Sequence, residues 1–198
     1  MLAACAVLIE ELGYDGVTTT LIAERAGVAV GSLYQFFPDK RAVVQALTMR
    51  NLDYYMNLIG QRLAEDRLDH WWDAVDVVFD AYVDMFREVA GFAKIRFGDV
   101  VDLRLIDDQR DNNTVIVERL VSVLTQRFDL GGVDLRLPIT VAVEIADGIL
   151  NLAFRRRLFA QDVVIAEAKK AIRGYLSDHL DRGRSLPAGA SVMSAGSD

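Results

Sequence analysis

The sequence predicts an all-α protein, because helical periodicity, helix-ending residues and a lack of strand alternation agree along the chain. Apolar residues recur every three or four positions through most of the 198 residues, as they do on one face of a helix. Gly13 and Gly27 follow two of these segments, at the position where glycine commonly ends a helix. No segment alternates polar and apolar residues over the length of a strand, and no internal repeat is found.

Nine helical segments are expected, of which the second and third are short. Thr18 suits the N-cap of the second, and Pro38 breaks the chain before the long fourth. Pro138 fits the first turn of the eighth, which is expected to finish near three consecutive arginines that suit its dipole. The expected ranges are residues 2–12, 19–26, 30–36, 39–66, 69–89, 92–108, 111–128, 138–157 and 162–181.

The composition is that of a soluble globular protein with a substantial core, since 52% of the residues are hydrophobic and 26% are charged. No apolar run approaches the roughly 20 residues that a membrane-spanning helix needs, which argues against a membrane partner. The N-terminus lacks a basic start and carries Glu10 and Glu11, so we interpret it as a helix and not as a signal peptide. The single cysteine, Cys5, cannot form an internal disulfide, which suits a reducing cytoplasm.

The formal net charge of −7 argues by itself against nucleic acid as a partner. Residues 1–50 hold four basic and five acidic side chains, whereas the remainder holds 18 basic and 24 acidic ones. The N-terminal segment is therefore much less acidic than the rest, without being basic. DNA binding there requires a local patch of positive charge whose attraction for phosphates outweighs the repulsion from the net negative charge of the whole chain.

Residues 18–40 predict a helix-turn-helix. A short helix, a tight turn at Gly27-Val28-Ala29 and a second short helix follow one another, the arrangement in which the first helix braces a second helix in the major groove. The apolar positions can form a compact core against the first helix of the chain. They are Ile22, Ala23, Ala26, Val28, Leu33 and Phe37.

The segment 13–40, GYDGVTTTLIAERAGVAVGSLYQFFPDK, resembles the DNA-binding domain of the tetracycline-repressor (TetR) family. The features that carry the resemblance are Gly13-Tyr14, a Thr opening the second helix, Ile22-Ala23, Ala26-Gly27-Val28, Gly31-Ser32-Leu33-Tyr34, Phe37 and Lys40. The chain departs from the family at Ala29, where an N-capping Ser is common, and at Leu21, where a polar residue is usual. It also starts inside the first helix, without the several residues, often basic, that usually precede it.

The resemblance implies two domains: residues 1–45 as a helix-turn-helix DNA-binding domain and residues 46–182 as a ligand-binding and dimerisation domain. Residues 183–198 are small and polar, which predicts a mobile tail. Major-groove contacts are implied for Val30, Gly31, Ser32 and Gln35. Phosphate contacts are implied for Thr18, Thr19, Thr20, Tyr34 and Lys40.

The resemblance places a homodimer interface on the last two long helices, where broad apolar stripes include small residues that allow close packing. The residues expected there are Ala142, Ile145, Ile149, Leu152, Ile172 and Tyr175. The alternative is that some of these residues form the intramolecular core instead.

Aromatic residues concentrate in one stretch of the second region, and an aromatic-lined apolar cavity suits a hydrophobic effector. The pocket candidates are Trp72, Phe79, Tyr82, Phe86 and Phe92, with Arg96 and Asn151 as polar anchors. An aromatic stripe at helical spacing is more often core than pocket, so only two or three of these residues are expected to line a pocket.

The acidic stripe Asp73-Asp76-Asp80-Asp84 is expected to be a solvated helix face, not a cation site. The sequence contains no metal-ligand cluster, no nucleophile with its base and no cofactor fingerprint. These absences favour a protein that is not an enzyme and has no cofactor. The resemblance implies a transcriptional regulator, which we expect to repress from a palindromic operator and to be released by a small hydrophobic effector. The alternatives are a small-molecule-binding helical dimer that has lost DNA binding and, less favoured, an enzyme using the aromatic cavity.

Overall fold

The computed structural model describes residues 1–65, 67–95, 112–156 and 159–181, which form helices and no strand. The all-α prediction is confirmed. The elements are α1 (Leu2–Gly16), α2 (Thr19–Arg25), α3 (Val30–Phe36), α4 (Lys40–Glu65), α5 (Trp71–Glu88), α6 (Asn112–Arg127), α7 (Arg136–Asn151), a π-helical turn η1 (Leu152–Arg156) and α8 (Gln161–Leu180).

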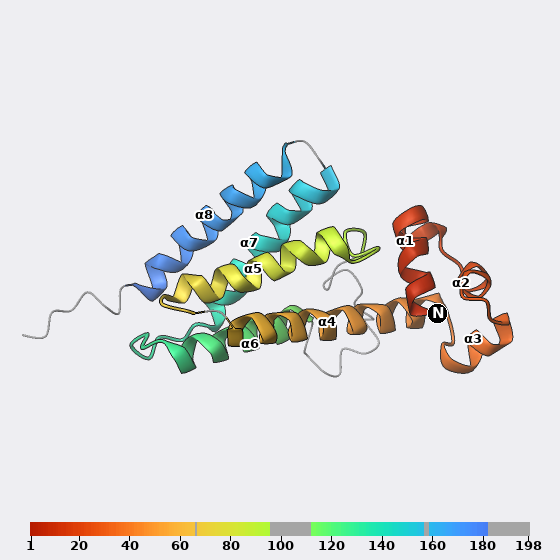
Figure 1. Cartoon of the computed structure of the whole chain (residues 1–198), viewed down its shortest axis with the longest axis horizontal. Coiled ribbons are helices and arrows are strands. Elements are labelled where there is room, and N and C mark those ends of the chain that lie inside the picture. Colours follow the sequence, from red (N-terminus) through yellow and green to blue (C-terminus); the bar gives the residue numbers. More distant parts are fainter. Residues whose placement is uncertain (66, 96–111, 157–158, 182–198) are drawn as a thin grey trace, which may run out of the picture.

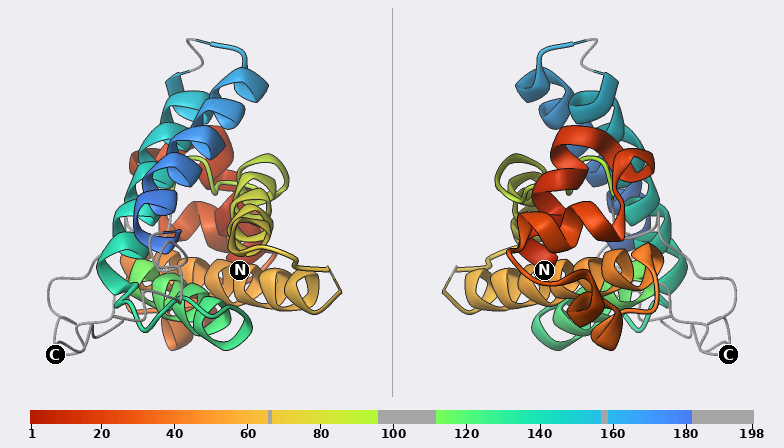
Figure 2. Two further views of the ribbon diagram at one scale, coloured as in Figure 1. Left: turned by 90° about the vertical axis from the view of Figure 1, so that its left-hand side faces the viewer. Right: turned by 90° about the vertical axis from the view of Figure 1, so that its right-hand side faces the viewer.

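The molecule is elongated, with α1, α2 and α3 at one end and α5 to α8 at the other (Figure 1). The long helix α4 joins the two ends. Helices α7 and α8 lie side by side along an outer edge, as both side views show (Figure 2).

Two clusters of buried side chains stabilise the two ends. The first holds α1, α2 and α3 together around Ile9, Ile22 and Leu33, and the second lies among α4 to α8. Helix α4 contributes to both, because Val44 is buried in the first cluster and Tyr55 in the second. A continuous helix therefore runs from one core into the other.

The predicted helix-turn-helix is confirmed in its helices and turn. The hydroxyl of Thr18 accepts a hydrogen bond from the amide of Leu21 at 3.2 Å, which caps α2. Gly27 has φ 68, a backbone conformation that disfavours any side chain, so the turn before α3 requires glycine. The expectation that Val28 is core was wrong, because this turn leaves it exposed.

The first helix differs from its prediction. α1 extends to Gly16, with the helical conformation interrupted at Gly13 (φ 73, ψ 171). Cys5 is fully buried in it, and burial raises the pKa of its thiol to about 11, so the thiol stays protonated and unreactive.

Two other segments differ from prediction or lie beyond the described ranges. The segment expected over 92–108 is described only for its first four residues, which form turns and no helix. The tail 183–198 lies outside the described residues.

The segment Arg136–Phe154 is long and apolar enough to cross a membrane, but a core helix of a soluble protein passes the same test.

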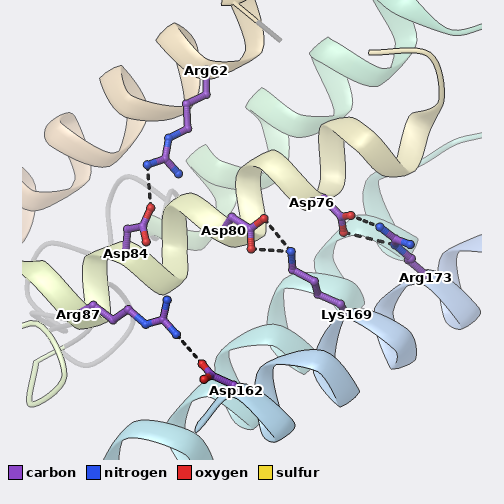
Figure 3. Close-up of polar contacts among 8 residues, drawn as sticks. All are labelled: Arg62, Asp76, Asp80, Asp84, Arg87, Asp162, Lys169 and Arg173. Carbon is purple, nitrogen blue, oxygen red and sulfur yellow. Dashed lines mark hydrogen bonds and ion pairs between the residues drawn. The ribbon is translucent and has the colours of Figure 1, made fainter. Parts of the chain in front are cut away.

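The acidic stripe of α5 faces cations from α4 and α8 (Figure 3). The stripe and its continuation at Arg87 form four ion pairs: Arg62–Asp84 (2.7 Å), Lys169–Asp80 (2.6 Å), Arg173–Asp76 and Arg87–Asp162 (2.9 Å). Asp76, Asp80 and Asp84 stay partly exposed, but each also pairs with a cation of another helix, which the expectation of a solvated face did not include. Asp73 instead accepts the backbone amides of Asp69 and His70 at the start of α5. Partly exposed pairs of this kind contribute about 0–1 kcal/mol each. Three of them join α5 to α8, and Arg62–Asp84 joins α5 to α4.

Candidate DNA interface and ligand cavity

Helix α3 is anchored on one side and exposed on the other. Leu33 is fully buried among α1, α2 and α4, and Val30 packs against the same cluster. Tyr34 is 52% exposed, and Gly31 and Gln35 are also exposed. Helix α3 therefore offers a solvent-facing surface on a rigid support, as a recognition helix needs.

Two of the expected phosphate-binding residues contact each other. The hydroxyls of Thr19 and Tyr34 lie 3.0 Å apart, which joins the start of α2 to the middle of α3. Thr20 is exposed beside them, whereas the hydroxyl of Thr18 already caps α2. The pair Thr19–Tyr34 fixes the angle between the two helices as well as presenting two hydroxyls to solvent.

Lys40 lies at the start of α4 and is held by α1. Its Nζ donates to the carbonyl oxygen of Tyr14 at 3.0 Å and lies 4.3 Å from the centre of the Tyr14 ring. The structure therefore gives Lys40 an internal partner that the sequence did not indicate. This contact closes the end of α1 against α4.

The sequence analysis did not include Phe36 among the candidate contacts, although its side chain is 68% exposed near the end of α3. An apolar ring in that position can contact a thymine methyl or a sugar. The sequence could have indicated this exposure, because consecutive residues of a helix point in different directions. Since Phe37 was expected to face the core, its neighbour Phe36 could not also do so.

The basic groups near α3 are few. Arg25 at the end of α2 forms a bidentate pair with Glu11 of α1, at 3.1 and 2.7 Å. The hydrogen bond from Arg25 lowers the pKa of the Glu11 carboxyl, which keeps the pair charged on both sides. Arg25 is thus neutralised within the chain, and positive charge available to a phosphate must come mainly from α4.

A cavity of about 40 Å³ lies among α4, α5, α6, α7 and α8. Its wall is apolar, and the two tyrosine hydroxyls beside it have partners. Tyr55 donates to the carbonyl oxygen of Val78 at 2.9 Å, and Tyr82 donates to Asp147 at 2.9 Å. Burial raises the pKa of Tyr55 far above its usual range, so it stays neutral. This cavity has room for a few water molecules and must expand to admit a larger ligand.

Among the expected pocket residues, Phe79 and Tyr82 line the cavity. Phe86 and Phe92 are buried beside it in an aromatic cluster with Phe154, where Phe86 stacks on Phe154 at 4.9 Å between ring centres. Trp72 stacks on His70 at the start of α5. Asn151 has a buried Oδ1 without a hydrogen-bond partner among the described residues, and Arg96 lies outside them.

The expected dimer residues divide into two groups. Ala142 and Ile172 are buried within the single chain and line the cavity, so they belong to the intramolecular core. The others are half-buried on α7, η1 and α8: Ile145, Ile149, Leu152 and Tyr175. The apolar stripes on these helices therefore form part of the intramolecular core, and only their half-buried residues remain available for a dimer interface.

The turn after α5 connects the cavity to α1. The rings of Tyr82 and Phe92 lie 5.7 Å apart, and Phe92 is followed three residues later by Ile95, which is buried in the cluster of α1, α2 and α3. Gly91 (φ 76) donates its amide to Glu10 of α1 at 2.8 Å. A Cβ at Gly91 would lie 2.7 Å from the carbonyl oxygen of Ala6, so only glycine fits against α1 here.

Known families match both ends of the chain. The model of bacterial regulatory proteins of the tetR family matches residues 1–47, and the model of the tetracyclin repressor-like C-terminal domain matches residues 69–180. A curated relative, the uncharacterized HTH-type transcriptional regulator YvdT of Bacillus subtilis (strain 168), is 30% identical over 80 residues. That match spans 40% of this chain and 40% of the length of YvdT.

Solved structures agree with these matches. A TetR-family transcriptional regulator from Streptomyces coelicolor is 37% identical, with a TM-score of 0.73 over 90% of this chain and 96% of that chain. The fold is also similar to a TetR variant from Acinetobacter baumannii AYE in complex with minocycline, with a TM-score of 0.59 and 18% identity over 93% and 97% of the two chains.

An exposed recognition helix on a compact support, joined to a helical body with an apolar cavity, defines a DNA-binding regulator with a C-terminal ligand-binding domain. The chain belongs to the tetracycline-repressor (TetR) family of transcriptional regulators. This family is one of regulators and not of enzymes.

The contact between Lys40 and Tyr14 predicts a measurable stability effect in the absence of DNA. Lys40→Gln should lower the free energy of unfolding by about 0.5–1 kcal/mol, the usual contribution of a cation over an exposed aromatic ring. Urea denaturation measures this loss. In a Tyr14→Leu background, which keeps the backbone carbonyl that Lys40 binds, the same substitution should cost less, and an equal cost in both backgrounds would show that the ring contributes nothing.

Proposed function

We propose that this protein is a homodimeric, cytoplasmic repressor that binds a palindromic operator and is released from it by a small hydrophobic effector. The observation that carries the proposal is the turn at residues 91–95, which belongs to both cores: Phe92 is buried in the cluster around the cavity, and Ile95 is buried in the cluster that holds α1, α2 and α3 together. Any enlargement of the cavity therefore strains the support of α3.

Operator recognition is assigned to the exposed face of α3. Gln35 can form two hydrogen bonds with an adenine, and Gly31 and Ser32 lie about one turn earlier on the same short helix. Val30 packs against the core, so its expected thymine contact is limited to the part of its side chain that stays exposed. The hydroxyls of Thr19 and Tyr34 face solvent together, where they can bind a phosphate. Because a dimer has a two-fold axis, the operator should be a palindrome with half-sites about one helical turn apart.

Gln35 and Tyr34 should differ in the kind of loss that their replacement causes. Gln35→Ala removes a base contact and should cost about 1–3 kcal/mol on an operator selected from random DNA, with little effect on unrelated DNA. Tyr34→Phe removes a phosphate contact and should weaken both DNAs alike. Fluorescence anisotropy with both DNAs at two salt concentrations measures the difference. If neither variant changes binding, α3 does not contact the operator as proposed; if no operator can be selected at all, the chain is instead a ligand-binding dimer that has lost DNA binding.

Two glycines within α7 and α8 support a dimer through these helices. Gly148 and Gly174 are exposed, and a Cβ at either one would meet no atom of the chain's described residues within 4 Å. Glycine within a helix costs about 1 kcal/mol relative to alanine, so its presence suits a surface that another helix approaches closely. Exposed apolar side chains occur on the same helices, with Leu137 72% exposed on α7 and Val163 61% exposed on α8.

Gly174→Glu should therefore stabilise α8 in one chain and yet prevent dimerisation. The wild-type chain should have the mass of a dimer by light scattering at micromolar concentration, and the variant that of a monomer with unchanged helical circular dichroism. Ala64→Glu, which adds the same charge on the exposed face of α4, is the matched control. A dimeric Gly174→Glu variant would contradict this interface.

The effector response can be imitated by a larger side chain in the cavity. Ala146 lines the cavity on α7, and Ala146→Leu should force its wall outwards as an effector does. We expect this variant to bind the operator at least tenfold more weakly than wild type. Since the strain is proposed to reach α1 through Gly91 and Glu10, adding Glu10→Ala should restore most of the affinity.

The neighbouring residue Glu11, which pairs with Arg25 and not with the turn, gives the control. Glu11→Ala should leave the effect of Ala146→Leu unchanged. If Ala146→Leu binds the operator as wild type does, although circular dichroism shows it folded, then the cavity does not control DNA binding and the proposed release mechanism is wrong.

A further inference from the structure

A groove of about 170 Å³ lies beside the apolar cavity, between α6 and α7, and six of its eight lining residues are polar or charged. Asn113 and Val143 line both spaces, so these two side chains separate them. Asn113 donates from Nδ2 to Oε1 of Glu144 at 3.0 Å across the groove. The contact is exposed, and water can replace it when the Asn113 side chain turns away.

The cavity itself has no partner for a polar group of a ligand. The hydroxyls of Tyr55 and Tyr82 are already engaged by Val78 and Asp147, and the remaining wall is apolar apart from Asn113 at its border. Burying a polar group there without a hydrogen bond is unfavourable. A ligand that carries such a group must therefore leave it in the groove, where it meets water and polar side chains.

The groove favours a positive head group over a negative one. Its charged side chains are Glu118, Glu144 and Arg136, which leave one net negative charge. The whole chain has a formal net charge of −7, which adds to the repulsion of an anion. Displacing Asn113 also frees Oε1 of Glu144, which can accept a hydrogen bond from an ammonium group.

We propose that the groove between α6 and α7 is the head-group subsite of the effector, and that the effector is an apolar molecule carrying one protonated amine. The amine binds Glu144 in place of Asn113, and the apolar part passes Val143 into the enlarged cavity. This inference rests on the proposed function only in requiring that the cavity binds a small molecule.

Two matched probes test the charge preference. The full-length protein is titrated by calorimetry with n-hexylamine and with hexanoate at pH 7, where the two have the same chain length and opposite charges. We expect hexylamine to bind at least tenfold more tightly than hexanoate. Glu144→Gln should reduce that preference to less than threefold, because the groove loses its central negative charge.

Two further variants separate the groove from the cavity. Glu24→Gln, on α2 and exposed, removes a carboxylate of the same kind far from α6 and should leave the preference unchanged. Ala146→Val fills part of the cavity, so it should weaken both probes by the same factor. A Glu144→Gln protein that still prefers hexylamine tenfold would overturn the subsite.

Equal or tighter binding of hexanoate would also overturn it, as would the absence of any binding of either probe at millimolar concentration. Operator binding is measured separately, by anisotropy without probe. Loss of operator binding with the amine preference intact would contradict the proposed repressor and leave the subsite standing, whereas the reverse result would contradict the subsite alone.

Discussion

The close approach of Gly91 to α1 determines how the two ends of the molecule are coupled. Its amide is bound by Glu10, and the space beside Ala6 excludes any side chain, so the turn cannot slide along α1 without breaking both contacts. With α4 running through both cores, the chain has two rigid connections and not one flexible linker. Through these contacts α1, which packs against α2 and shares a buried cluster with α3, is tied to the turn that follows α5.

The helix-turn-helix was predictable because its signals are local. Thr18 caps α2 through an amide three residues away, and Gly27 meets a backbone requirement of its own turn. The cavity was less predictable, since Phe79, Tyr82 and Phe86 share one stripe of α5 and only their neighbours on α6 and α7 decide which of them border space. The ion pairs of α5 join residues 22 to 97 positions apart, a separation at which the sequence pattern carries no information.

The dimer prediction shows a related limit of periodicity. Ala142 and Ile172 fit an apolar stripe equally well whether the stripe faces its own chain or a second copy, and the structure places both in the cavity wall. Gly148 and Gly174 are more informative, because an exposed glycine within a helix has no advantage in an isolated chain. The sequence contained this signal, but its meaning depends on knowing which face is exposed.

The small size of the free cavity has a consequence for the sensitivity of the regulator. In the proposed mechanism, part of each effector's binding free energy is used to enlarge a cavity of about 40 Å³, so the apparent affinity is lower than that of a preformed site. The concentration at which a cell responds is then determined by how well the surrounding side chains pack, as well as by contacts to the effector. Substitutions that loosen this packing, even out of reach of the effector, should make the response begin at a lower dose, so that the threshold can evolve separately from chemical selectivity.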